Sequence, residues 1–356
     1  MPKMAKRKTD KRLEALINDG AHIYSISKLN TLNQCPYQAY MTYVEHKPQK
    51  NVGIYGILGE KCHDKLEEII KNEAVPNDIK QAVQEELNDL EMCGVDFPLD
   101  KNGNSTIKNN WIANMMTFAD YFERPDGDFE TEQLCLYNVK DEIWMQGYID
   151  LIRNNDDGSI DIIDWKTSSQ FTGKHLIEAG RQLVLYALAK RQEGYKVNSV
   201  KWYMLKYCET TYPLKNGKTK SKVSEWRNFV KDLSVPITND LTSLGYDDID
   251  SEIMLNEAVE NNNLDNMPDE IKNKYKPVPY VREYELTDEI IEETLAYIND
   301  TIKKFESSDN KWEPCDINKE SFFCASLCGY GGKSGQCKYY VDYCDAFDGK
   351  SDDDLF

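Results

Sequence analysis

The sequence predicts a mixed α+β (α/β) fold in which a small mixed β-sheet is flanked by helices, and three observations lead to it. Helical patterns dominate residues 24–123. From Phe129 onward, short segments rich in β-branched and aromatic residues alternate with polar turns, as strands do. Residues 174–193 then form a helical pattern, and residues 197–209 a further strand. Helices before and after a group of strands are typical of an α+β core.

The helical part begins after a basic arm. Residues 1–20 form a flexible arm that leads into a short helix, and its basic side chains are Lys3, Lys6, Arg7, Lys8, Lys11 and Arg12. Residues 24–44 combine a capping residue, Ser27, with an aromatic-rich helical pattern. Apolar residues at helical spacing predict an amphipathic helix over residues 57–71. Further helices are expected near 77–92, 106–123 and 287–306.

Composition and charge limit the class of protein. The chain has 356 residues, of which 40% are hydrophobic, which is ample for a packed core. No apolar run approaches the roughly 18–20 residues needed to cross a bilayer, and the basic N-terminus lacks the apolar stretch of a secretory signal. We therefore expect a cytoplasmic protein without a membrane partner. The net charge of −19 is unusual for a nucleic-acid binder, but bound divalent metals can offset carboxylates locally, so the charge does not exclude such a role.

The most informative segment is GYIDLIRNNDDGSIDIIDWKTSS. Its centre, Asn154–Ser159, contains Asp-Gly and reads as a hairpin turn. Folding about this turn places Asp150 almost opposite Asp164, and the two-residue period of a strand puts Asp164 and Lys166 on one face. Carboxylates can hold Mg²⁺ or Mn²⁺, which activates water for attack on a phosphodiester, and a nearby lysine can orient that water. The alternative is a hairpin with a solvated polar face.

The segments GYIDLI and IIDWKT resemble the second and third motifs of RecB-like nucleases in the PD-(D/E)XK superfamily. Upstream, YSISKLNTLNQCPYQAYMTYV resembles the family's serine-containing helix and Cys-Pro element, and LGEKCHDKLE resembles the helix with the metal-binding histidine, here His63. Downstream, RQLVLYALA resembles the Gln-x-x-x-Tyr motif at Gln182 and Tyr186. These motifs occur in the family's order, over residues 24–71, 129–207 and 280–340.

The resemblance implies a restriction-endonuclease-like core and a set of site residues. The expected metal ligands are His63, Asp150, Asp164 and the backbone carbonyl of Trp165. Lys166 is expected to be the catalytic base or the group that orients water. Gln182 and Tyr186, on one helical face, are expected to contact substrate phosphate or to support Lys166. Three alternatives stay open. His63 has a purely structural role, and Gln182 and Tyr186 are an ordinary interior polar pair. Glu132 is an accessory acid.

Cysteines crowd the C-terminal part of the chain. Many members of the family join their two ends through a four-iron four-sulfur (4Fe-4S) cluster, as in the iron–sulfur CRISPR-adaptation and AddB-type nucleases. The resemblance implies Cys35, Cys324, Cys328 and Cys337 as its ligands, with Cys315 and Cys344 as further candidates. Spacing does not separate an iron–sulfur cluster from Zn²⁺. The other cysteines, which are expected to be buried hydrophobic residues, are Cys62, Cys93, Cys135 and Cys208.

We expect a metal-dependent DNA nuclease, acting as an exonuclease on single strands or ends in recombination, repair or phage DNA processing, in a bacterial or phage-infected cell. The alternatives are a catalytically silent DNA-binding scaffold and a zinc-stapled interaction protein. The acidic tip Ser351–Phe356 resembles the tips by which bacterial single-stranded-DNA-binding proteins dock replication and repair partners. The expected organisation is one nuclease domain over residues 21–345, with a helical part (24–123), a sheet (129–208), an insertion (209–280) and a helix with the cysteine cluster (281–345), followed by an acidic tail (346–356).

Overall fold

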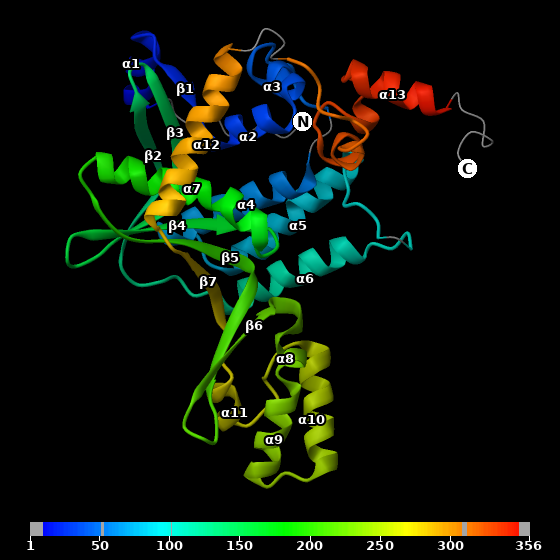
Figure 1. Cartoon of the computed structure of the whole chain (residues 1–356). Helices are drawn as coiled ribbons and strands as arrows, with labels where there is room; N and C mark the ends of the chain where they lie inside the picture. Colours follow the sequence, from blue (N-terminus) through cyan, green and yellow to red (C-terminus); the bar gives the residue numbers. More distant parts are fainter. Residues whose placement is uncertain (1–9, 51–52, 101, 308–311, 349–356) are drawn as a thin grey trace.

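The computed structural model describes residues 10–50, 53–100, 102–307 and 312–348, and it confirms the mixed fold. Helices lie on both faces of a seven-stranded sheet (Figure 1). The helices are α1 (Lys11–Asn18), α2 (Ile26–Gln34), α3 (Pro36–Tyr43), α4 (Ile54–Ile70), α5 (Asn77–Met92), α6 (Thr106–Tyr121), α7 (Gly173–Gln192), α8 (Phe229–Asp232), α9 (Ser234–Leu244), α10 (Asp248–Asn261), α11 (Asp269–Lys274), α12 (Asp288–Ser307) and α13 (Lys338–Asp348). Short 3-10 and π turns are Trp226–Asn228, Phe323–Leu327 and Gly332–Ser334.

The sheet is a meander that continues through a parallel crossover. Its strands are β1 (His22–Tyr24), β2 (Asp128–Lys140), β3 (Ile143–Asn154), β4 (Ser159–Lys166), β5 (Lys196–Pro213), β6 (Thr219–Glu225) and β7 (Val278–Tyr284). Strands β2, β3 and β4 are successive antiparallel neighbours. Helix α7 then carries the chain across to β5, which runs parallel to β4, and β6 and β7 both pair antiparallel with β5. Because β3 and β4 lie inside the sheet, they are rigid supports for functional side chains.

Two hydrophobic cores cover the two faces of the sheet. On one face, α4 buries Leu58, Cys62, Leu66 and Ile69, at the spacing of one helical side, in a cluster shared with α5 and α6. On the other face, α7 buries Leu183 and neighbouring apolar residues against the strands. The catalytic candidates on β3 and β4 are therefore enclosed by α4 from one side and α7 from the other.

The N-terminal helical pattern is interrupted, and one expected cap is wrong. Residues 24–44 form two helices, α2 and α3, because Pro36 lacks a backbone N–H and begins a new helix at its first position. The helix cap is Ser25, whose Oγ accepts the backbone N–H of Lys28 at 3.1 Å, and not Ser27. Residue Ser27 lies within the first turn of α2. The sequence does not distinguish the two serines, because they are separated by one residue and serine at either position satisfies the capping preference.

The segment 209–280, which has weak periodicity in sequence, forms the end of β5, strand β6 and helices α8–α11. These helices extend below the sheet (Figure 1), and the fully buried Trp226 ties them to the core of α4–α6. Within the described ranges, no helix is long and apolar enough to cross a membrane. The basic residues up to Lys8 and the acidic tip Ser351–Phe356 lie outside the described residues.

Candidate active site

The β3–β4 hairpin brings the two aspartates together. Its ladder pairs Asn154 with Ile160 and ends at Leu151 with Ile163, one step before Asp150 and Asp164. Beyond the end of this ladder, a backbone-to-side-chain hydrogen bond connects the two strands: the backbone N–H of Trp165 donates to Asp150 Oδ2 at 2.7 Å. The register predicted from the Asp-Gly turn therefore holds, and the two carboxylates lie where the strands begin to separate.

Lys166 completes the group and is held by a chain of hydrogen bonds. Its Nζ lies 2.6 Å from Asp164 Oδ2 and donates to Gln182 Oε1 at 3.1 Å. Gln182 Nε2 donates to the Tyr186 hydroxyl at 2.6 Å, and that hydroxyl donates to the backbone carbonyl of Tyr148 at 2.6 Å. The lysine side chain is 23% exposed, whereas that of Asp164 is 2% exposed. A buried network thus orients an ammonium group at the mouth of the site.

Helix α4 supplies the histidine. His63 Nδ1 lies 3.7 Å from Asp150 Oδ2, and the imidazole packs edge-on against Trp165 with ring centroids 5.7 Å apart. One turn before His63, Gly59 lies close to Thr167, since a Cβ there would be 3.1 Å from Thr167 Oγ1. Helix α4 therefore packs closely on the segment that follows β4, and this packing positions His63.

These residues share one open cavity of about 300 Å³. The lining includes the side chains of His63, Asp150, Asp164, Lys166, Gln182 and Tyr186 that the sequence nominated. Trp165, for which only the backbone carbonyl was expected to act, and Glu132, left open as an accessory acid, do not line it. Sequence reasoning missed the serines of the α2 start and several β3 residues, because only folding brings them here. The full lining is Ser25, Ile26, Ser27, His63, Gln146, Gly147, Tyr148, Asp150, Asp164, Lys166, Gln182, Leu185 and Tyr186.

The electrostatics of the cavity favour a cation. Burial, followed by the neighbouring Asp164, raises the pKa of Asp150 well above its usual value, and burial also raises the pKa of Asp164. Burial works to lower the pKa of Lys166, but Asp164 and Asp150 outweigh it and the pKa of Lys166 is raised. Two buried carboxylates therefore face one ammonium, and a divalent cation would relieve their repulsion.

The donor set fits a hard divalent ion. Asp164 Oδ2 is buried and lies 2.6 Å from the Lys166 ammonium, so this oxygen already faces a cation. Carboxylate oxygen and imidazole nitrogen are ligands for Mg²⁺ or Mn²⁺. As the side chains stand, no three His, Cys, Asp or Glu residues in the described ranges form a complete metal-binding group. Within the described residues, the cation that Asp164 Oδ2 faces is the Lys166 ammonium, at 2.6 Å.

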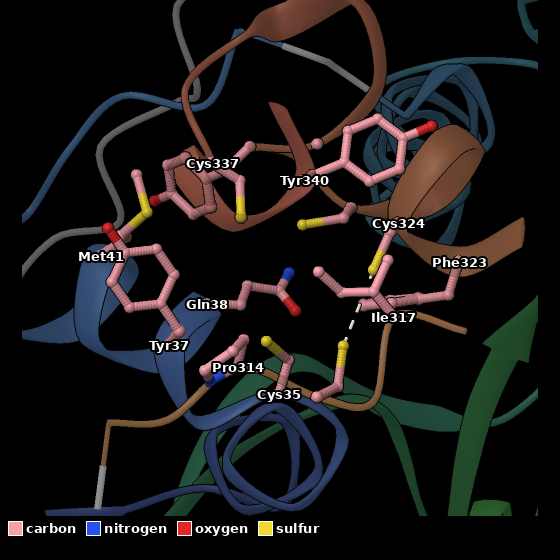
Figure 2. A pocket seen from close by; sticks show the side chains of 14 residues that line it. Cys35, Tyr37, Gln38, Met41, Pro314, Ile317, Phe323, Cys324, Cys337 and Tyr340 are labelled. Carbon is pink, nitrogen blue, oxygen red and sulfur yellow. Dashed lines mark hydrogen bonds between the residues drawn. The ribbon is translucent and has the colours of Figure 1, made fainter. Parts of the chain in front are cut away.

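A second cavity gathers cysteines from the two ends of the chain. Figure 2 shows Cys35, at the α2–α3 junction, facing Cys324 and Cys337 from the C-terminal segment. The Sγ atoms of Cys315 and Cys324 lie 3.6 Å apart. The five cysteines that line this cavity are Cys35, Cys315, Cys324, Cys328 and Cys337. The structure therefore brings together the four expected positions and adds Cys315, whereas Cys344 does not line the cavity.

The remaining cysteines follow the expectation with one exception. Cys62, Cys135 and Cys208 are at most 1% exposed and pack as small apolar groups. Cys93 is exposed, so its expected burial is wrong. It follows the last residue of α5, where the helix ends and the amphipathic pattern no longer determines which side is covered.

A family model described as the PD-(D/E)XK nuclease superfamily matches residues 23–330, which is most of the chain. A search of curated proteins finds no match. The matched range includes the complete β3–β4 hairpin, α4 and α7, and it ends within the cysteine-rich segment.

Proposed function

The chain belongs to the PD-(D/E)XK nuclease superfamily, and we propose that it is a metal-dependent deoxyribonuclease that cleaves at the pocket of His63, Asp150, Asp164 and Lys166. One observation carries this proposal: the four side chains, from α4, β3 and β4, line one cavity. Their types match the needs of phosphodiester hydrolysis, which requires a cation held by carboxylates and a group that positions water.

Each residue has a distinct part in the proposed reaction. Asp150, Asp164, His63 and the Trp165 carbonyl hold Mg²⁺ or Mn²⁺, whose chemistry is to polarise the phosphoryl oxygen and acidify a bound water. Lys166 orients the attacking water and stabilises the charge that develops on the phosphate. Gln182 and Tyr186 fix the Lys166 ammonium through the hydrogen bonds described above. Asp150 is itself positioned by the Trp165 N–H.

The shape of the cavity supports action on single strands or ends. With a volume of about 300 Å³ it is at the small end of ligand pockets, and the start of α2 closes one side through Ser25, Ile26 and Ser27. In this proposal the wall formed by the start of α2 disfavours a duplex and leaves room for an unpaired strand. We therefore propose an exonuclease, with recombination, repair or phage DNA processing as its setting. Docking of a replication or recombination protein on the acidic tip belongs to the same proposal.

The cysteine cavity is proposed to hold a structural metal centre. The fit is supported by the convergence of sulfurs from remote segments, with Cys35, Cys324 and Cys328 all buried. A 4Fe-4S cluster bound by Cys35, Cys324, Cys328 and Cys337 agrees with the family resemblance. Zn²⁺ is the alternative: Zn–S bonds of about 2.3 Å place sulfurs about 3.8 Å apart, close to the 3.6 Å between Cys315 and Cys324. Either centre would join the two ends of one nuclease domain.

A cleavage assay tests the proposal. The protein is purified without oxygen and incubated with labelled single- and double-stranded DNA in Mn²⁺, beside the variants Lys166→Ala and Asp164→Ala. We expect degradation that requires the metal, prefers single strands or ends, and is lost in both variants. Binding of DNA without cleavage under any metal would instead favour the catalytically silent scaffold.

A further inference from the structure

The connection between β5 and β6 carries a local excess of positive charge. Residues 210–224, called the lysine hairpin below, contain four lysines and no Asp or Glu. This is unusual in a chain whose net charge is −19. Glu209 and Glu225 limit the basic segment on either side. The four lysines are Lys215, Lys218, Lys220 and Lys222.

The lysine hairpin is an ordered element. Its strands pair in register from Thr210 with Lys222 to Pro213 with Thr219. The turn is closed by hydrogen bonds from Leu214 N to Lys218 O at 2.7 Å and from Gly217 N to Leu214 O at 3.0 Å. Gly217 has φ +79°, which an Asn-Gly turn requires. The lysines are therefore presented on a fixed support, which reduces the entropy lost when a ligand binds.

The charge of the lysine hairpin is not neutralised within the described residues. Lys215, Lys218 and Lys220 are exposed and Lys222 is half-buried. Lys215 donates to the neutral Ser243 hydroxyl at 3.1 Å, and the described part of the chain contains no ion pair to any of the four. By contrast, Lys196 and Lys201, earlier on β5, face Asp157 and Asp161.

The sheet connects this charge directly to the proposed cleavage site. Lys166, the last residue of β4, pairs with Met204 of β5, and β5 continues in the same direction to Pro213 (Figure 1). Pro213 lies nine residues after Met204, and at about 3.3 Å per residue this part of β5 spans at most about 30 Å. A nucleic-acid strand whose bases stay stacked, as in a duplex, advances about 3.4 Å per nucleotide, so this distance corresponds to at most about nine nucleotides, and to fewer where the strand is extended.

We propose that the lysine hairpin binds the phosphate backbone of the substrate, at most about nine nucleotides from the bond that is cleaved. This inference rests on the proposed nuclease function and extends it to the path of the DNA. Helix α10, which packs on the α9 helix that Lys215 contacts, has five Asp or Glu residues and no Lys or Arg, so this side of the insertion repels phosphate. Phosphate contacts of this kind position DNA without reading its sequence.

Binding measurements on matched variants test the proposal. One variant combines Lys215→Ala, Lys218→Ala, Lys220→Ala and Lys222→Ala. The control removes the same charge elsewhere, through Lys140→Ala, Lys303→Ala, Lys304→Ala and Lys319→Ala. With a labelled DNA of about 30 nucleotides in Ca²⁺, we expect the hairpin variant to bind roughly tenfold more weakly. The slope of log K against log salt should also fall by about three, since each phosphate contact contributes about 0.7–0.9. The control should change neither quantity.

Cleavage of DNA of two lengths separates this inference from the proposed function. We expect the hairpin variant to cleave DNA of about three nucleotides at the wild-type rate, because so short a strand does not span the roughly 20–30 Å between Lys166 and the lysines, and to cleave DNA of about 30 nucleotides more slowly. Equal DNA affinity and salt slope in the two variants would overturn the inference and favour an acidic protein segment as the partner. Absence of cleavage by the wild type would contradict the nuclease function alone, because the binding comparison needs no hydrolysis.

Discussion

The cavity that contains Asp150, Asp164 and Lys166, called the carboxylate pocket below, and the cysteine cavity are assembled in different ways. Asp150, Asp164 and Lys166 lie within one hairpin, and the strand register places them. The cysteine cavity combines Cys35 with residues almost 300 positions later in the sequence. Its segments are held by scattered hydrogen bonds, such as Tyr37 N to Glu313 O at 3.2 Å and the Tyr330 hydroxyl to Lys47 O at 2.8 Å.

This difference indicates what each site needs in order to form. The hairpin site is formed by the sheet itself, so the relative positions of Asp150, Asp164 and Lys166 along the strands are fixed before any ligand binds. The cysteine site requires closure of a very long loop, whose entropic cost a metal centre offsets. We therefore expect changes in the hairpin to affect chemistry, and changes among the cysteines to affect stability.

The largest expected effect is on chemistry. Asp150→Asn keeps the shape of the side chain but removes the charge that would hold the metal. We expect cleavage to fall by about a thousandfold, the scale seen when one transition-state-stabilising group is lost, with little change in the thermal midpoint. Single-turnover cleavage in Mn²⁺ measures it. Asp156→Asn, in the exposed turn of the same hairpin, is the control, and an equal loss there would refute a specific role for Asp150.

The next effect is on stability. Among the described residues that line the cavity, Cys35 is the only cysteine from the N-terminal part of the chain, and Cys35→Ser removes its thiolate. We expect loss of the bound metal and a drop in unfolding free energy on the order of 4 kcal/mol, by analogy with covalent closure of a long loop. Urea unfolding with metal analysis checks both. The exposed Cys93→Ser should change stability by no more than about 0.5 kcal/mol. Equal free energies of unfolding for Cys35→Ser and wild type would show that the cysteine cavity does not stabilise the fold by joining the two ends of the chain.

A smaller effect tests how tightly Lys166 is supported. A Cβ on Gly147 would lie 2.5 Å from the ring of Tyr186, so Gly147→Ala must displace the tyrosine that holds Gln182. We expect a loss of about 1–3 kcal/mol of stability, as for other overpacked sites, and slower cleavage. Gly56→Ala, where a Cβ meets nothing within 4 Å, is the matched control. Unchanged cleavage in Gly147→Ala would exclude a positioning role for Tyr186.

The smallest expected effect is on the pH dependence of stability, through Asp161 on β4. Although burial opposes it, hydrogen bonds from Ser199 and Asn198 and the nearby Lys201 hold the pKa of Asp161 below its usual value. A lowered folded-state pKa contributes stability above the unfolded pKa of about 4 and loses it as pH falls. Asp161→Asn should therefore cost about 1–2 kcal/mol at neutral pH, and the difference should shrink in acid. Urea unfolding across pH checks this, and a constant difference would contradict it.

The same comparison explains what sequence could predict. The α+β class, most helices and the convergence of Asp150, Asp164 and Lys166 followed from local patterns, because periodicity and turn chemistry act over short distances. The sequence did not nominate three residues that line the pocket, Ser25, Gln146 and Tyr148. No local pattern shows which residues of α2 and β3 the fold turns toward the pocket. Cys315 was a spare candidate that only long-range folding could place. Cys93 was misjudged because burial at a helix end depends on neighbours distant in sequence.

The most direct test of the account measures both sites in the same preparations. Wild type, Lys166→Met and Cys35→Ser are each assayed for bound zinc or iron and for Mn²⁺-dependent cleavage of a short single strand, at a temperature where all three are folded. We expect Lys166→Met to keep the thiol-bound metal and lose cleavage, and Cys35→Ser to lose the metal and keep cleavage. Cleavage by Lys166→Met, or its loss in folded Cys35→Ser, would contradict the assignment of catalysis to the carboxylate pocket.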